Sequence, residues 1–148
     1  MALRLIPALA LALALAASSR ATAQHLRFEL ASGPSESVPA TFDELRARVV
    51  ALGTITWEDA PYFDPYAASG GATYASITFD YRADSVTVTW TQFADAGAAS
   101  SAEREFLNSY GPDGWVRFAR DGRVMLQVYS NGGVPESAGE ALTALLGG

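Results

Sequence analysis

Residues 74–93 read YASITFDYRADSVTVTWTQF, a run in which apolar and polar side chains alternate. A period of two places successive side chains on opposite faces of a strand, so the run predicts two strands that each bury one face. The stretch 82–85 joins them as a hairpin, which makes the pair antiparallel. The predicted core residues of these two strands are Ala75, Ile77, Phe79, Tyr81, Val86, Val88 and Trp90.

The other face of the second strand carries Thr87, Thr89 and Thr91. We expect these side chains to be solvated, because an antiparallel sheet commonly leaves one face open to water. An open face or a free sheet edge is also a surface on which a polypeptide partner, or a second copy of the chain, can dock. The three threonines are therefore candidate partner-binding residues.

A helix is predicted upstream of the hairpin. Thr41 and Glu44 have the spacing of a capping box, in which each side chain bonds a free backbone N–H at the helix start. Apolar residues then recur at helical spacing, which predicts a helix over 42–52, and Gly53 suits the C′ position after it. Before this helix, the alternation in His25–Leu30 predicts a further strand.

Downstream of the hairpin, the sequence predicts a second helix and a second hairpin. Residues 94–99 are small and indicate a linker, and Ser100 to Glu103 form a second capping box. The helix that follows is predicted to end at Gly111. The remaining elements are strands at 115–119 and 124–128 around an Asp121-Gly122 type I′ turn, and a last helix after Pro135.

Together with a short strand at Thr54–Trp57, these elements have the order β-α-β-β-β-α-β-β-α. Strands joined by hairpins favour an antiparallel sheet, and helices packed on one face of it make a two-layer α+β fold. The chain has 148 residues, enough for one domain, and we place that domain at 24–148.

The first 23 residues have the pattern of a signal peptide. Arg4 supplies a positive start, Leu5–Ala17 is apolar, and Ala21 to Ala23 form an A-x-A cleavage site. The apolar run is shorter than the ~20 residues that span a membrane, so we expect no stable membrane insertion after cleavage. The predicted product is a periplasmic or secreted protein that begins at Gln24.

Composition excludes several functional classes. The chain has no cysteine and one histidine, so thiol catalysis, Cys-ligated metals and multi-histidine metal sites lack their residues. It carries 10 basic and 16 acidic residues, a formal net charge of −6, which opposes binding to nucleic acid. No motif for a cofactor or a nucleophilic hydrolase is present, and we expect a protein that is not an enzyme.

The stretch Glu58–Gly71 is predicted to be a long loop, because it contains two prolines and two glycines. Its carboxylates suit calcium or acid–base chemistry between Asp59 and Asp64, and its aromatic rings suit a glycan or a peptide. The simplest alternative is a loop whose rings cover one end of the sheet. The candidate ligand-binding residues here are Trp57, Asp59, Tyr62, Phe63, Asp64 and Tyr66.

The segment from Glu105 to Leu145 resembles the C-terminal half of the YbjN-type family of bacterial sensory transduction regulators. The resemblance is carried by Phe106-Leu107-Asn108, the Arg120-Asp121-Gly122 turn between two strands, Gly132-Gly133-Val134 and the helix start at Glu136. The order α-β-β-β-α-β-β-α from Thr41 onward is similar to that family and to the type III secretion chaperone-like fold. The resemblance implies a non-enzymatic protein that binds a polypeptide, with homodimers as an alternative.

Overall fold

The computed structural model describes residues 37–67, 70–111 and 115–147. The predicted signal peptide and the predicted strand at His25–Leu30 lie outside these ranges. The described elements are α2 (Phe42–Leu52), β1 (Thr54–Asp64), β2 (Ala72–Tyr81), β3 (Asp84–Phe93), α3 (Ala96–Tyr110), β4 (Val116–Asp121), β5 (Val124–Ser130) and α4 (Pro135–Leu146). This confirms the α+β class with an antiparallel sheet.

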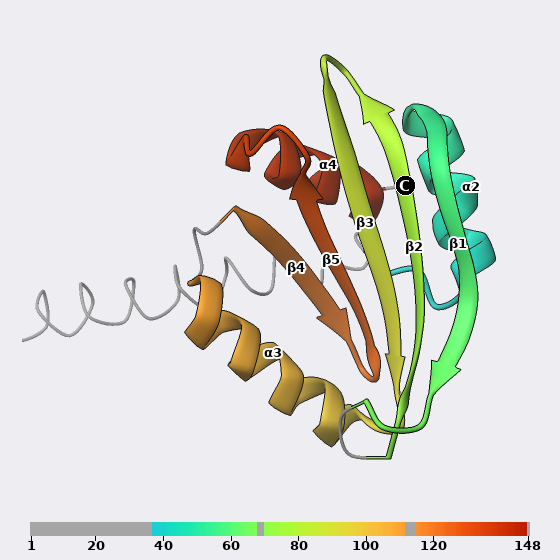
Figure 1. Ribbon diagram of the computed structural model, residues 1–148, viewed down its shortest axis with the longest axis vertical. Helices are drawn as coiled ribbons and strands as arrows, with labels where there is room; N and C mark the ends of the chain where they lie inside the picture. The colour runs from blue at the N-terminus through green and yellow to red at the C-terminus, as the bar shows by residue number, and fades with distance from the viewer. Residues whose placement is uncertain (1–36, 68–69, 112–114, 148) are drawn as a thin grey trace, which may run out of the picture.

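The five strands form one sheet in the order β1-β2-β3-β5-β4, with every neighbouring pair antiparallel (Figure 1). The hairpin predicted within residues 74–93 is confirmed. Tyr81 pairs with Asp84, so the turn consists of Arg82 and Ala83, and Arg82 adopts a positive φ of 55°. Among the described strands, β1 and β4 form the two edges of the sheet.

The second hairpin turn is shifted by one residue from its predicted place. Asp121 pairs with Val124, so the turn consists of Gly122 and Arg123. A type I′ turn needs positive φ at both central residues, whereas only Gly122 has it, at 56°. Glycine therefore occupies the first turn position, and Asp121 belongs to β4.

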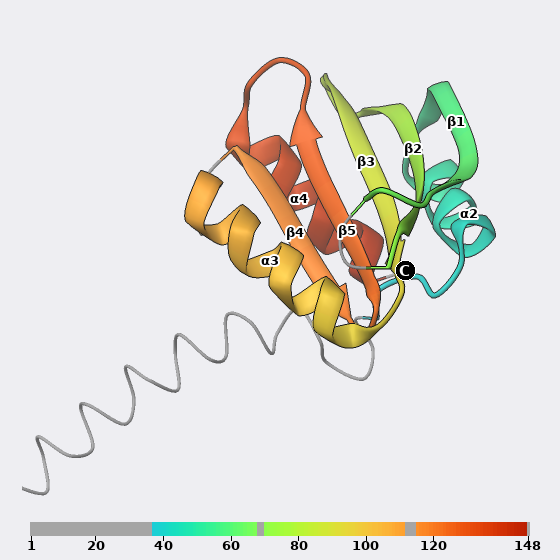
Figure 2. The same cartoon turned by 60° about the horizontal axis from the view of Figure 1, so that its bottom comes forward.

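Helices α2 and α4 cover one face of the sheet and enclose the main core (Figure 2). All seven core residues predicted for β2 and β3 are buried there. Leu45 and Val49 of α2 and Leu142 and Leu145 of α4 pack against them. The indole Nε1 of the buried Trp90 donates a 3.0 Å hydrogen bond to the carbonyl of Pro39, which fixes the entry to α2 over the core.

The expectation that all helices share one face is wrong. Helix α3 lies on the opposite face, where Ala98 and Ala99 pack with Phe93 and Met125 in a second apolar cluster (Figure 2). Residues 96–99 of the predicted linker form the first turn of this helix. Alanine has the highest helix propensity, and its small side chain allows close approach to the sheet, which the prediction of a linker at 94–99 did not take into account.

The start of α3 also differs from its predicted capping box at Ser100. Asp95 is the N-cap residue, and its Oδ1 accepts a 2.8 Å hydrogen bond from the backbone N–H of Ala98. Aspartate and serine are about equally favourable as N-cap residues. The helix starts after Asp95 because this earlier start includes Ala98 and Ala99, which are buried. The end of α3 at Gly111 is as predicted.

The capping box of α2 is present, with one change of partner. The Thr41 hydroxyl accepts from the N–H of Glu44 at 3.2 Å, as predicted. The Glu44 carboxylate reaches back to the N–H of Ala40 at 3.0 Å rather than to the cap residue itself. The same carboxylate accepts from Arg48, whose guanidinium also donates to the carbonyl of Leu145 at 2.8 Å. Arg48 therefore ties α2 to the end of α4.

Gly53 follows α2 as predicted, but the reason for glycine differs. Its φ is −171°, an extended conformation that any residue adopts, so no left-handed turn is present. A Cβ atom at this position would lie 1.9 Å from the carbonyl oxygen of Asp80. Glycine is required because the chain passes directly against β2 as it leaves α2.

Asp84 connects the β2–β3 turn to the segment between β5 and α4. Its carboxylate accepts from the Ser130 hydroxyl and, at 2.8 Å, from the N–H of Ser85. The hydrogen bond from Ser130, followed by smaller contributions from Ser137, Ser85 and Gly132, holds the pKa of this carboxyl below its ordinary value of 3.8 against the opposing effect of burial. The ionised form is therefore favoured in the folded protein.

We expect Asp84→Asn to lower the melting temperature at pH 7 and to do so less at low pH. A carboxyl group whose pKa is depressed by folding stabilises the protein above its unfolded pKa and loses that effect as the pH falls through the folded value. The gap between the two melting curves should therefore be constant above about pH 5 and narrow below about pH 3.8. Thermal melts from pH 7 to 2.5 measure this, and an unchanged gap would contradict the role of the charge.

Candidate functional site

Strand β1 is much longer than predicted, and the proposed loop Glu58–Gly71 is wrong over its first half. The strand continues to Asp64 and pairs with β2, with register irregularities between Ile55 and Trp57 and between Asp59 and Tyr62. Pro61 lies within the second irregularity, where a missing backbone N–H breaks no regular pair. An edge strand tolerates such a proline, whereas the sequence reasoning treated it as the end of a strand.

Four of the six candidate ligand-binding residues lie on the sheet face that carries α3. Residues directly opposite each other in an antiparallel pair share a face. In β1 and β2 the pairs on this face are Trp57 with Thr78, Asp59 with Ser76, Tyr62 with Tyr74, and Asp64 with Ala72. The predicted loop residues are thus displayed by a strand, in a row along one edge of this face.

The other two candidates lie elsewhere. Phe63 lies on the opposite face of β1 from Tyr62 and Asp64, and its ring lies against Gly71. Tyr66 lies in the turn after β1, and 94% of its surface is exposed. The structure therefore does not bring these two rings together with the rest of the predicted set.

Thr87, Thr89 and Thr91 lie on the same face as Tyr62 and Tyr74, one strand further in. The expectation of a solvated threonine face is wrong for two of them, because Thr87 is 5% and Thr91 1% exposed, while Thr89 is half-buried. Their hydroxyls bond across the strands: Thr87 to Thr78 at 2.8 Å and Thr89 to Ser76 at 3.0 Å. We call this row of paired hydroxyls the hydroxyl ladder. Each hydroxyl gains a hydrogen-bonding partner in the pair, which it needs because neighbouring side chains cover it.

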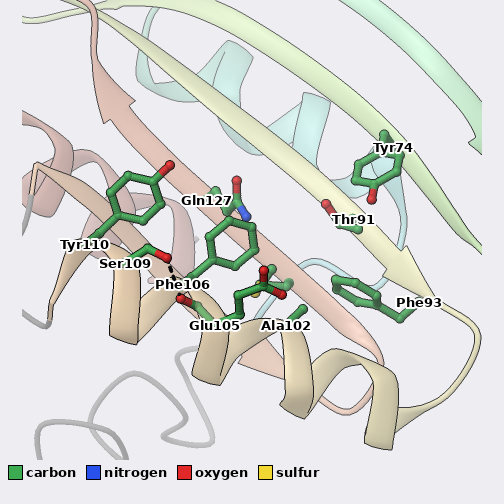
Figure 3. Close-up of a pocket in the computed structure, with 10 residues that line it drawn as sticks. Tyr74, Thr91, Phe93, Ala102, Glu105, Phe106, Ser109, Tyr110 and Gln127 are labelled. Carbon is green, nitrogen blue, oxygen red and sulfur yellow. Dashed lines mark hydrogen bonds between the residues drawn. The ribbon is translucent and has the colours of Figure 1, made fainter. Parts of the chain in front are cut away.

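A groove of about 350 Å³ lies between α3 and this face of the sheet (Figure 3). Its floor comes from β2, β3 and β5, and includes Thr91 of the threonine set. One wall is a stripe of α3 residues spaced three and four apart, which is the spacing of one helix face. The lining side chains are Tyr74, Thr91, Phe93, Met125 and Gln127 of the sheet and Ala102, Glu105, Phe106, Ser109 and Tyr110 of α3.

Aromatic rings stand on two sides of the groove. Phe106 and Tyr110 of α3 stack with ring centroids 6.1 Å apart and planes 18° from parallel. Tyr74, on the sheet, lies 5.9 Å from the ring of Tyr62 on the edge strand. Figure 3 shows Tyr74 and Tyr110 at opposite ends of the lining set, with Phe106 and Gln127 between them. Tyr62 is 53% exposed, so the edge of the face offers an open ring.

One acidic side chain lines the groove, and a second carboxylate lies near it. Burial raises the pKa of the Tyr74 phenol, and the nearby Asp64 carboxylate and Tyr62 raise it further, so the phenol keeps its proton. Glu105 projects from α3 toward the space beside Phe106 (Figure 3). Among the described residues, neither Glu105 nor Asp64 has a basic partner within ion-pair distance. By contrast, Glu103 of the same helix pairs with Arg120 at 2.5 Å.

Sequence reasoning missed the α3 half of this site. Phe106 and Tyr110 fall within the predicted second helix, but they were not named as candidate site residues. Their spacing of four, with Glu105 and Ser109 beside them, was the available signal, since it puts polar and aromatic groups on one stripe. That stripe becomes a wall only because α3 packs on the face opposite α2 and α4, which the spacing does not indicate.

Within the described ranges, no group of three or more His, Cys, Asp or Glu side chains is arranged to hold a metal ion. In the same ranges, none of the helices combines the length and the apolar character needed to cross a membrane. No protein-family model, curated protein or solved structure matches this chain. A function must therefore be inferred from the chemistry of the groove.

Proposed function

We propose that this protein is a non-enzymatic binding module that holds an extended polypeptide segment in the groove between α3 and the sheet. One observation carries the proposal. Four of the six residues predicted for ligand binding and all three predicted for partner binding share the face of the sheet on which the groove lies, and Thr91 lines the groove itself. Two independent sequence signals thus favour the same surface.

The shape of the groove suits a short length of chain. Its lining on α3 runs from Ala102 to Tyr110, which corresponds to about 12 Å along a helix. An extended chain advances about 3.3 Å per residue, so this length accommodates roughly three to four residues. A volume of about 350 Å³ is within the range of ligand-binding clefts.

The lining groups suit binding more than catalysis. Gln127 and Thr91 offer hydrogen-bonding groups from the floor, and the rings supply apolar contact of the kind that anchors interfaces. The Ser109 hydroxyl already donates its proton to the backbone carbonyl of Glu105 in a 2.9 Å hydrogen bond. The chain has no cysteine, and its one histidine lies outside the groove's elements.

The proposal agrees with the resemblance of residues 105–145 to the YbjN-type family. Under that resemblance the protein is a regulatory or chaperone-like partner-binding domain. We place it in the periplasm or the external medium, after cleavage near Ala23, because of the signal-peptide pattern at residues 1–23. The domain is proposed to span 24–148, with its first strand at His25–Leu30.

A second candidate is a glycan binder that uses the edge of the same face. Trp57 and Tyr62 are each 53% exposed and lie on the face of the hydroxyl ladder. An open aromatic ring next to paired hydroxyls is a surface on which a sugar can stack and bond. This candidate predicts that Trp57→Ala abolishes binding while Tyr110→Ala leaves it intact.

The polypeptide proposal is tested with a synthetic library of twelve-residue peptides, screened against the protein by fluorescence anisotropy. Tyr110→Ala should weaken the Kd of bound peptides by about tenfold, since truncation of an aromatic side chain that anchors an interface costs more than about 1 kcal/mol. Tyr66→Ala is the matched control, because this tyrosine lies outside the groove, and it should change the Kd less than twofold.

Two results would overturn the proposal. The first is that no peptide of the library binds. The second is that Tyr66→Ala weakens binding whereas Tyr110→Ala does not, which would move the site to the turn after β1. Circular dichroism melts of both variants check that they remain folded.

A further inference from the structure

We infer that the groove selects a cationic side chain, so that the bound polypeptide segment is a basic one with lysine or arginine at its centre. This rests on the proposed function and adds the chemical class of the partner. The inference combines three features of the described residues: the carboxylates in and near the groove, its aromatic walls, and a lining that contains no basic side chain.

One carboxylate lines the groove, and two others lie on the same face of the sheet, on β1. Glu105 lines it from α3, and Asp64 lies on β1 close enough to act on the phenol of Tyr74. Asp59 occupies the same face of β1, opposite Ser76 in the hydroxyl ladder. Asp64 accepts a hydrogen bond from the N–H of Tyr66 at 2.9 Å, which leaves its charge unneutralised.

Arg120, which lies opposite the groove residue Met125 in the sheet, is already engaged. Arg120 donates from Nε to Glu103 at 2.5 Å and from a terminal nitrogen to the carbonyl of Gly122 at 3.1 Å. The half-buried Glu103–Arg120 pair is therefore neutral as a unit. Among the described side chains that line the groove, the charged one is the acidic Glu105, and the Asp64 carboxylate lies near the lining residue Tyr74.

The aromatic walls add attraction for the same kind of group. A ring face carries negative electrostatic potential and attracts an ammonium or guanidinium within about 6 Å of its centre. The pair Phe106–Tyr110 and the pair Tyr62–Tyr74 offer such rings from the helix and from the sheet. Rings combined with carboxylates favour organic cations, because small hydrated metal ions prefer sites made of oxygen ligands alone.

Charge complementarity also disfavours other ligands in the groove. The whole chain has a formal net charge of −6, so a second copy would bring further negative charge to a groove lined by the acidic Glu105. Like charges that face each other across an interface oppose association. An acidic or phosphorylated segment is disfavoured for the same reason.

The test uses three peptides that are identical except at one central position, which is lysine, acetyl-lysine or glutamate. The Kd of each peptide for the full-length protein is measured by fluorescence anisotropy at low and at high salt. The lysine peptide should bind about tenfold more tightly than the acetyl-lysine peptide, and the glutamate peptide more weakly still. Added salt should narrow these differences.

Glu105→Gln and Asp64→Asn should each reduce the preference for lysine over acetyl-lysine by at least about threefold. Glu136→Gln is the matched control, because Glu136 begins α4 on the other side of the sheet, and it should leave the preference unchanged. Equal binding of the lysine and acetyl-lysine peptides, or an undiminished preference in both groove variants, would overturn the inference while the proposed function stands. Failure of all three peptides and of the wider library would overturn both.

Discussion

Replacement of Phe79 by alanine is expected to lower the free energy of unfolding by about 3–5 kcal/mol. Phe79 is fully buried and lies in β2 between Ile55 of β1 and Val86 of β3. Its ring also contacts Tyr81 edge-on, with centroids 6.2 Å apart. Truncation removes a large apolar surface and leaves a cavity below α2, which a close-packed core cannot refill.

Urea denaturation followed by tryptophan fluorescence measures this loss. Phe63→Ala is the matched control, because it removes the same side chain from the neighbouring strand at a position that is 61% exposed. We expect less than about 1 kcal/mol for the control, as is usual at exposed sites. Similar losses for the two variants would contradict the assignment of Phe79 to the core face.

The second large effect is expected for Gly53→Ala. The new Cβ atom would lie 1.9 Å from the backbone carbonyl oxygen of Asp80, so the junction of α2 and β1 must move away from β2. We expect a loss of about 1–3 kcal/mol or more, as for other substitutions that overfill a packed site. The loss arises from contact with the backbone, which cannot rotate aside.

Gly139→Ala provides the comparison for that experiment. Gly139 lies within α4, where an added Cβ would be 3.6 Å from Nε of Arg117, an ordinary contact. Alanine is favoured over glycine inside a helix by about 1 kcal/mol, so this variant should be slightly stabilised. Urea denaturation of both variants should give opposite signs, and a neutral Gly53→Ala would show that the close approach to Asp80 is absent.

The alternation in residues 74–93 contained most of the information about the core. Because side chains in a strand alternate strictly, Ile77, Phe79 and Val88 were predictable as buried without knowledge of the rest of the fold. The helix at 42–52 was equally predictable, since Thr41 and Glu44 specify its start. Local patterns of this kind depend only on neighbours in the sequence.

The errors concern features that depend on contacts distant in the sequence. Pro61 is tolerated in β1 because β1 is an edge strand, a fact set by the order of all five strands. Asp95, rather than Ser100, begins α3 because Ala98 and Ala99 gain burial against Phe93 and Met125. Neither preference is visible in the local sequence.

Individual residues of the candidate site were predictable from the sequence, but their arrangement was not. Tyr62 and Asp64 were identified by their unusual chemistry, and Thr91 by its place in an alternating strand. Their position on one face follows from the β1–β2–β3 register, which requires β1 to extend to Asp64. Phe106 completes the groove because α3 crosses to that face.

The most direct test of the groove as the binding site is an NMR titration of the isotope-labelled protein with the lysine peptide. Binding in the groove predicts the largest amide shift changes at Thr91, Gln127 and Ser109, which belong to three of the elements that line it. Small changes are expected on α2, on the other side of the sheet. Changes centred on Tyr66 or on the exposed face of α2, with Thr91 and Ser109 unmoved, would contradict the account.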